Sequence, residues 1–232
     1  MKEKPLLIRC SSLGALITEP KLKADKESGN LSETAKGMVL ELWLQKKFGY
    51  KERVMTDAMM KGLLCEQDSM ALVQSVLGGE FRVKNKPTLY NDFICGTPDL
   101  VLKSGVVEDI KTSENLRTFV QSDIDKGYVA QLQGYMALTG LKKARLIYCL
   151  VPTPIELVEN KKKSLYFKFE CNESNPDYIE MCEQIEHNNF LISGIDKKHK
   201  VKVFEIERDQ EMIDLIYLKV EKAREYFNEL KL

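Results

Sequence analysis

GTPDLVLKSGVVEDIKTS, residues 96–113, indicates a β-hairpin at the centre of the fold. Two stretches rich in branched apolar residues flank a Lys-Ser-Gly turn at residues 103–105. If the glycine takes the left-handed conformation that closes a three-residue loop, Leu102 pairs with Val106. That register continues along both strands, so the turn decides which side chains of the hairpin face one another.

The three-residue loop brings charged residues of the hairpin together. It places Asp109 opposite Asp99. Because side chains alternate along a strand, Lys111 then shares a face with Asp109. Glu108 and Ile110 point to the other face. A two-residue turn would shift the register by one residue and take Asp99 out of the cluster.

Two facing carboxylates need a cation between them. Asp99 and Asp109 repel each other at this separation and do not both stay ionised without such an ion. Mg²⁺ prefers carboxylate and water ligands, so it resolves the conflict. The alternative is a surface hairpin in which Asp109 simply forms a salt bridge with Lys111.

Residues 57–77 are predicted to form one helix, with Thr56 as its N-cap and Gly78-Gly79 at its end. Glu66 lies in the middle of an apolar stripe on this helix, where a carboxylate is costly unless it is paired or bound to metal. We expect Glu66 to be a third metal ligand; the alternative is a buried glutamate paired with a lysine. The stripe has helical spacing and consists of Met59, Leu63, Met70, Val73 and Leu77.

Residues 124–139 are predicted to form another helix, which ends at Gly140. Gln131 and Tyr135 are four residues apart, so they share a face with Tyr128. This pattern allows a functional Gln131, and it equally allows a glutamine that only caps the core.

The rest of the chain predicts an α/β (α+β) fold, with a central mixed β-sheet flanked by helices. We expect a single domain over residues 1–232, whose catalytic motifs lie within 8–140 and whose segment 141–232 completes the fold. Ser32 is the expected cap of the first long helix. The further predicted strands are 81–86, 93–102, 106–112, 144–151, 164–170 and 201–207, and the further helices are 32–48, 176–192 and 209–230.

Composition excludes several classes of protein. Apolar residues make up 44% and charged residues 30%, and no apolar run approaches the roughly 20 residues that span a bilayer, so we expect a cytosolic protein without a membrane role. The six cysteines are scattered without a CxxC pair, which argues against zinc and against an iron–sulfur cluster. The formal net charge is zero, but clumped lysines can form a rim that faces phosphates.

With these motifs the sequence resembles the PD-(D/E)xK nucleases, and among them the YqaJ-like viral recombinases of the lambda exonuclease type, which have a restriction-endonuclease-like core. Pro98-Asp99 followed by Asp109-Ile110-Lys111 matches the signature, and Glu66 matches an additional acidic ligand. AQLQGYMALTG, residues 130–140, matches the glutamine motif, and IRCSSLGAL, residues 8–16, is similar to the opening segment. One departure is Asp109, where many relatives carry glutamate.

The resemblance implies a role for each matching residue. Mg²⁺, for which Mn²⁺ substitutes, would be held by Glu66, Asp99, Asp109 and the backbone carbonyl of Ile110. Lys111 would position or deprotonate the attacking water, Gln131 would orient the water or Lys111, and Tyr135 would support Gln131. Ser11 and Arg9 are candidates for contact with a 5′-terminal phosphate.

The resemblance also implies a substrate and partners. It predicts digestion of double-stranded DNA ends in the 5′→3′ direction, which leaves a 3′ single strand for an annealing protein. It further predicts a homo-oligomer, such as a ring-shaped trimer, made by a phage or prophage in the cytoplasm of a bacterial host. The alternatives are a non-processive endonuclease or repair nuclease with the same site, and a DNA-binding protein whose nuclease fold is inactive.

Overall fold

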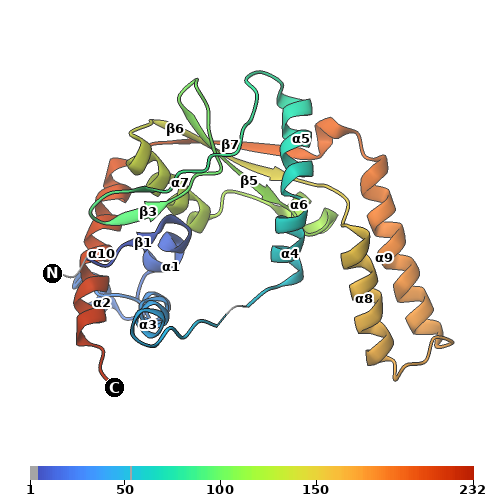
Figure 1. Ribbon diagram of the computed structural model, residues 1–232, viewed down its shortest axis with the longest axis horizontal. Helices are drawn as coiled ribbons and strands as arrows, with labels where there is room; N and C mark the ends of the chain where they lie inside the picture. The colour runs from blue at the N-terminus through green and yellow to red at the C-terminus, as the bar shows by residue number, and fades with distance from the viewer. Residues whose placement is uncertain (1–4, 53) are drawn as a thin grey trace.

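The central sheet of the protein has four strands in the order β4-β5-β6-β7 (Figure 1). The structure is a computed structural model that describes residues 5–52 and 54–232. β5 and β6 run parallel, whereas β4 and β7 are antiparallel to their neighbours, so the sheet is mixed as expected. The strands are β4 (Leu100–Val101), β5 (Val106–Thr112), β6 (Lys143–Cys149) and β7 (Val201–Glu207).

The hairpin between β4 and β5 has the three-residue register. Leu102 donates its backbone N–H to the Val106 carbonyl at 2.9 Å, and Gly105 has φ of +83°, a conformation that favours glycine. Leu100 lies opposite Glu108 in the same ladder. Asp99 directly precedes Leu100 and therefore lies opposite Asp109, which confirms the predicted pairing.

Each face of the four-stranded sheet packs against helices, because side chains of opposite faces alternate along its strands. Val107, Leu146 and their neighbours on one face join a core that includes α7 (Lys126–Thr139), α3 (Glu33–Phe48) and α10 (Gln210–Glu229). On the other face, Ile147, Cys149 and Val151 pack against Leu72 and Val73 of α5 (Glu66–Leu77). The helix-flanked mixed sheet confirms the predicted fold class.

A second, smaller sheet was not predicted. It has the order β1-β3-β2, with strands β1 (Ile8–Arg9), β2 (Leu89–Tyr90) and β3 (Ile94–Gly96). After β1, the chain forms η1 (Cys10–Ser12) and α1 (Leu13–Leu16), which packs on α7. A Cβ atom on Gly14 would lie 2.6 Å from the Cα atom of Gly127, so this close approach requires glycine.

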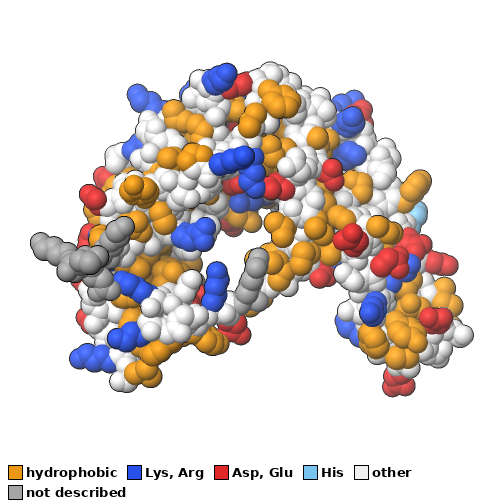
Figure 2. Space-filling view, in the orientation of Figure 1, with side chains coloured by type: hydrophobic (Ala, Val, Ile, Leu, Met, Phe, Trp, Pro, Cys, Tyr) orange, Lys and Arg blue, Asp and Glu red, His pale blue; other side chains and the backbone are white. Residues whose placement is uncertain are grey.

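Two helices form an arm beside the rest of the fold (Figure 1). α8 (Ile155–Lys168) and α9 (Pro176–Gly194) pack on each other and stand apart from α3 and α10. Figure 2 shows an open hollow between these two parts, with acidic and basic side chains gathered at its upper end. The other short helices are α2 (Lys23–Glu27), α4 (Asp57–Leu64), α6 (Leu116–Gln121) and η2 (Lys197–His199).

The structure corrects three predicted elements. The segment 164–170 is not a strand: residues 164–168 are the C-terminal part of α8, whose buried Leu157, Val158 and Leu165 have helical spacing, and residues 169–170 form the turn that follows. Residues 81–86 form no strand, because Arg82 is bound through its side chain rather than through a ladder. The predicted helix 57–77 is interrupted at Cys65 between α4 and α5.

The predicted helix caps agree with the structure. Ser32 Oγ accepts a hydrogen bond from the Ala35 N–H, and Thr56 Oγ1 accepts one from the Met59 N–H. Each bond satisfies a backbone donor that has no partner within its helix. Over the described ranges, no helix combines the length and apolar character needed to cross a bilayer.

Candidate active site

Asp109 is the most deeply buried acid among the predicted site residues. Its side chain is only 1% exposed, although it carries a carboxylate. Lys111 Nζ lies 2.7 Å from Oδ2 and forms an ion pair with it, and no other described group donates a hydrogen bond to that oxygen. The hairpin therefore forms the Asp109–Lys111 pair of the alternative interpretation, but it is not a surface hairpin.

Asp99 faces Asp109 and responds to its charge. The pKa of Asp99 is raised to about 7, first because the carboxyl is largely buried and then because of the charge of Asp109 and a hydrogen bond with it. Glu66 raises this pKa further, whereas Lys111 opposes the rise. Near neutral pH, Asp99 is therefore partly protonated in the absence of a cation.

A chain of contacts fixes the lysine of the hairpin. Lys111 Nζ lies 3.4 Å from Gln131 Oε1 and 4.5 Å from the centre of the Tyr128 ring. Gln131 Nε2 donates to the Tyr135 hydroxyl at 2.9 Å, as predicted for a supporting tyrosine. Burial raises the pKa of Tyr135, so its phenol stays neutral at physiological pH. Gln131 thus does more than cap the core, because it links α7 to Lys111.

Glu66 occupies a different environment from the one predicted. It is the first residue of α5 and is 35% exposed at its side chain, whereas Met59 and Leu63 of the supposed apolar stripe are exposed. The helix break at Cys65 turns another set of residues inward. Glu66 forms an ion pair with Lys84, which agrees with the lysine-paired alternative.

Four predicted site residues line one cavity of about 430 Å³, namely Glu66, Asp99, Ile110 and Lys111. An adjoining cavity of about 580 Å³ is lined by Ser11 and Gln131, and both cavities share Tyr128. Arg9 lies on β1, is exposed, and lines neither cavity. Its contact with a terminal phosphate stays a prediction.

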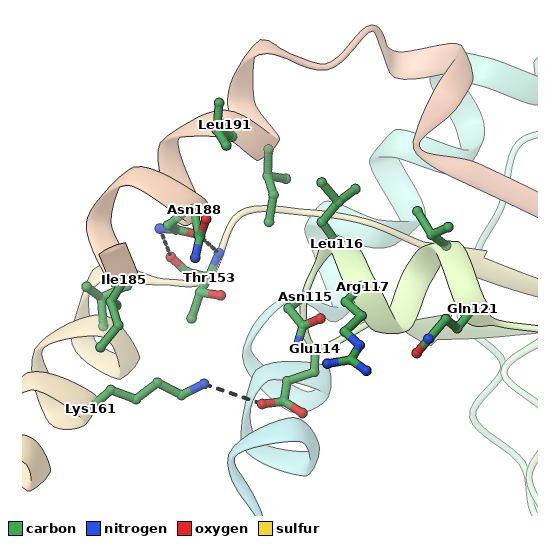
Figure 3. A pocket seen from close by; sticks show the side chains of 14 residues that line it. Glu114, Asn115, Leu116, Arg117, Gln121, Thr153, Lys161, Ile185, Asn188 and Leu191 are labelled. Carbon is green, nitrogen blue, oxygen red and sulfur yellow. Dashed lines mark hydrogen bonds and ion pairs between the residues drawn. The ribbon is translucent and has the colours of Figure 1, made fainter. Parts of the chain in front are cut away.

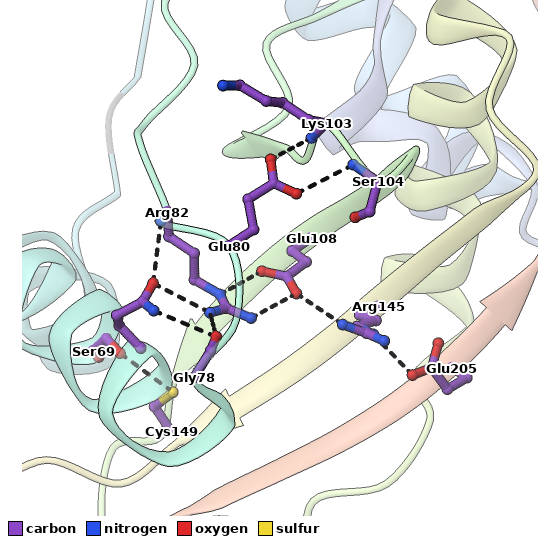
Figure 4. Close-up of polar contacts among 11 residues, drawn as sticks. Ser69, Gly78, Glu80, Arg82, Lys103, Ser104, Glu108, Arg145, Cys149 and Glu205 are labelled. Carbon is purple, nitrogen blue, oxygen red and sulfur yellow. Dashed lines mark hydrogen bonds and ion pairs between the residues drawn. The ribbon is translucent and has the colours of Figure 1, made fainter.

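The acid next to Asp109 has the opposite environment (Figure 4). Glu108 is fully buried and accepts hydrogen bonds from Arg82 Nε at 2.7 Å and Nη2 at 3.0 Å. Arg145 Nη1 adds a third contact at 3.3 Å and also holds Glu205 through Nε. Sequence reasoning placed Glu108 away from the site but missed this cluster, although an acid on a buried strand face signals a nearby cation.

A solved exonuclease structure resembles this chain over nearly its whole length. The phage related exonuclease from Haemophilus somnus 129PT matches with a TM-score of 0.78 and 29% sequence identity, over 97% of this chain and 95% of that protein. The chain has the fold of the phage-type exonucleases. The predicted resemblance to PD-(D/E)xK nucleases of the lambda exonuclease type is therefore confirmed.

A more distant alkaline exonuclease has the same fold as this phage-exonuclease-like chain. LHK-Exo from Laribacter hongkongensis matches with a TM-score of 0.64 and 15% identity, over 96% of this chain and 88% of that protein. Its complex with dAMP matches with a TM-score of 0.63, 16% identity and the same coverage. No family model and no curated protein matches the chain.

The aspartate pair of this phage-exonuclease fold suits a divalent cation. Hard cations take carboxylate oxygens, and the buried Oδ2 of Asp109 is neutralised by Lys111 alone among the described residues. Over residues 5–52 and 54–232, no three acidic, histidine or cysteine side chains already form a metal-binding group. The Asp99 and Asp109 carboxylates therefore suit a divalent ion, although Lys111 pairs with Asp109 and Lys84 pairs with Glu66 in the metal-free structure.

A separate cavity of about 690 Å³ lies between α6 and the α8–α9 arm (Figure 3). Leu116, Ile185 and Leu191 contribute apolar surface, and Lys161 pairs with Glu114 at its margin. None of the predicted site residues lines this cavity. The candidate active site is therefore the smaller cavity at the hairpin.

Proposed function

We propose that this chain is a Mg²⁺-dependent exodeoxyribonuclease that hydrolyses phosphodiester bonds at the ends of double-stranded DNA. The observation that carries the proposal is the buried Asp109 opposite the half-buried Asp99, with Lys111 paired to Asp109 on the same face of the hairpin. The exonuclease neighbours support the same chemistry.

The two aspartates and the backbone carbonyl of Ile110 would hold the metal, and Mn²⁺ would substitute for it. When bound, the ion lowers the pKa of a coordinated water and offsets negative charge that grows in the transition state. Asp109 and Tyr128 direct the Lys111 ammonium toward the cavity, where it orients the attacking water. Gln131 keeps Lys111 in that place, and Tyr135 keeps Gln131 in place in turn.

The DNA end would enter beside the metal site. Ser11 lines the cavity that adjoins Lys111 and Gln131, so its hydroxyl is available to donate to a terminal phosphate. Arg9 is assigned the same role on the resemblance alone. We assign 5′→3′ polarity to the digestion, which leaves a 3′ single strand.

The wider biological setting belongs to the same proposal. A single-strand annealing protein would receive the 3′ tail, and a homo-oligomer such as a ring-shaped trimer would hold a chain of zero net charge on DNA. We assign the work to one domain over residues 1–232, in the cytoplasm of a bacterium that carries the phage or prophage.

An end-labelled duplex tests the proposal. Linear DNA labelled at the 5′ or the 3′ end and a covalently closed circle are incubated with and without Mg²⁺. We expect mononucleotide release from the 5′ end only with Mg²⁺, and an intact circle. Cleavage of the circle would instead identify an endonuclease, and no cleavage of any substrate would identify an inactive DNA-binding protein.

Asp109→Ala is the test variant for this assay, and Gln133→Ala is the control outside the site. Gln133 lies two residues from Gln131 on α7 but bonds the Glu207 carbonyl and the Asp209 N–H, away from the cavity. Asp109→Ala is expected to lower the turnover by about a thousandfold or more while the protein stays folded. Undiminished cleavage by Asp109→Ala would refute the assignment of the catalytic site.

A further inference from the structure

The loop of residues 78–88 fastens α5 to the catalytic hairpin (Figure 4). Glu80 accepts hydrogen bonds from the backbone N–H groups of Lys103 and Ser104 at the hairpin turn. Arg82 binds Glu108 on β5 and the carbonyl of Gly78. The loop therefore has a fixed position against the hairpin before any ligand binds.

Further along the loop, the backbone contacts the main chain of one predicted metal ligand, Asp99. The Asn85 N–H donates to the Asp99 carbonyl at 2.7 Å. Lys84 directly precedes Asn85 and is therefore one residue from this backbone contact with Asp99, while its ammonium pairs with Glu66. Lys84, Glu66 and Asp99 line the same cavity.

The ion pair with Lys84 engages Glu66, the acid expected as the third metal ligand. The Lys84 ammonium lies 2.5 Å from Glu66 Oε1, so a metal ion that binds Glu66 through this oxygen has to displace the ammonium. The cost of this displacement is small, because the two side chains are 48% and 35% exposed and water screens their attraction. Breaking the pair also sets free a positive charge at the mouth of the cavity.

We propose that Lys84 is a placeholder for the metal ion: it neutralises Glu66 in the metal-free protein and, once the ion displaces it, binds a phosphate of the DNA substrate. The inference rests on the proposed function, because it assumes that the ion and a DNA strand meet in this cavity. It adds a phosphate-binding residue that becomes available only when the metal is bound. A lysine ammonium suits a DNA phosphate, whose affinity for cations dominates protein–DNA binding.

The first test measures metal affinity without catalysis. Isothermal titration calorimetry with Mn²⁺ compares wild-type protein with Lys84→Ala and with Lys86→Ala, an equal charge change on an exposed residue of the same loop. Without its competitor, Lys84→Ala should bind Mn²⁺ roughly 1.5-fold to 5-fold more tightly. Lys86→Ala should match wild type. An unchanged or weakened affinity in Lys84→Ala would overturn the proposal.

The second test measures when Lys84 reaches DNA. The affinity for a short duplex is followed by fluorescence anisotropy over a range of salt, in Ca²⁺ and in EDTA, and the length of the duplex is checked on a gel. In Ca²⁺, Lys84→Ala should lower the log–log salt slope by about 1 relative to wild type. In EDTA the two slopes should agree, because Glu66 still holds the lysine. Equal slopes in Ca²⁺, or the same difference in EDTA, would refute the switch.

The two proposals fail separately. In one outcome, wild-type protein cleaves no DNA with Mg²⁺ while Lys84→Ala still binds Mn²⁺ more tightly. That result would refute the nuclease function and support the competition between Lys84 and the metal. If cleavage depends on Mg²⁺ but Lys84→Ala binds Mn²⁺ as wild type does, the placeholder falls alone. Thermal melting of each variant checks folding, which an exposed lysine on a loop should not affect.

Discussion

Replacing Asp109 with asparagine should make the metal-free protein more stable at pH 8, although Asp109 is a buried residue of the central sheet. The reason is the neighbouring Asp99, whose pKa is raised from 3.8 to about 7. A carboxyl with a raised pKa stabilises the fold fully below its unfolded pKa, and this stabilisation is lost as the pH rises through the folded pKa. Metal-free wild-type protein should therefore lose stability between about pH 4 and pH 7.

The magnitude follows from the two pKa values. Between pH 5 and pH 8, ionisation of Asp99 lowers the free energy of unfolding by at most about 3 kcal/mol. Burial is the largest cause of the shift and Asp109 comes second, so Asp109→Asn should recover a minor share, roughly 1 kcal/mol. Lys111 keeps a counter-ion in the variant, because Asp99 also interacts with it.

Urea denaturation followed by circular dichroism, at pH 5 and pH 8 in EDTA, measures this effect. Asp99→Asn is the matched control, because it removes the titrating group and should give the smallest loss of stability between the two pH values. With saturating Mg²⁺ the order should reverse, since wild-type protein gains more binding free energy than a variant that lacks a ligand. The reasoning is refuted if Asp109→Asn is less stable than wild type at pH 8 in EDTA, or if all three proteins have the same pH dependence.

Three further predictions concern residues around the site. Arg82→Met should lower the free energy of unfolding by about 3–5 kcal/mol, because it leaves a buried carboxylate without its bidentate partner; a change below 1 kcal/mol in urea denaturation would contradict this. Gly14→Ala should cost about 1–3 kcal/mol because its Cβ meets the backbone of Gly127, whereas Gly37→Ala, with open space around its Cβ in α3, should be neutral or stabilising. Glu66→Ala should weaken Mg²⁺ binding by roughly tenfold in calorimetry, and an unaltered titration would remove Glu66 from the set of ligands.

Much of the fold could be predicted where local signals are complete. The strand 201–207 and the helices capped by Ser32 and Thr56 follow from alternation and from capping side chains. The segment 164–170 misled because alternating apolar residues over seven positions also occur at the end of a helix. The predicted strand 93–102 contains β3 of the smaller sheet and β4 of the central sheet, and its division into two strands was missed. The strands β1 and β2 could not be found, because two residues show no periodicity.

In the candidate site, too, only the residues linked by a local signal could be predicted. Asp99, Asp109 and Lys111 lie within one hairpin, so the length of its turn was enough to predict that they meet. A lysine partner for Glu66 was the alternative, but neither Lys84 as that partner nor Arg82 as the partner of Glu108 could be identified, because each pair spans 18 or 26 residues of chain that include an irregular loop. Long-range ion pairs of this kind leave no repeating pattern in the sequence.

Glu108 and Asp109 are consecutive residues of β5, and their loss should have opposite effects on the stability of the fold. Glu108 has donors for both of its oxygens, so its loss leaves the buried Arg82 guanidinium without its carboxylate partner. Asp109 faces the carboxyl of Asp99, so its loss relieves the repulsion between the two acids in the metal-free protein. A lineage of this protein kept only by demands on folding would drift away from Asp109 long before Glu108. The persistence of Asp109 among descendants would therefore record selection for chemistry, whereas the persistence of Glu108 would record only selection for a stable sheet.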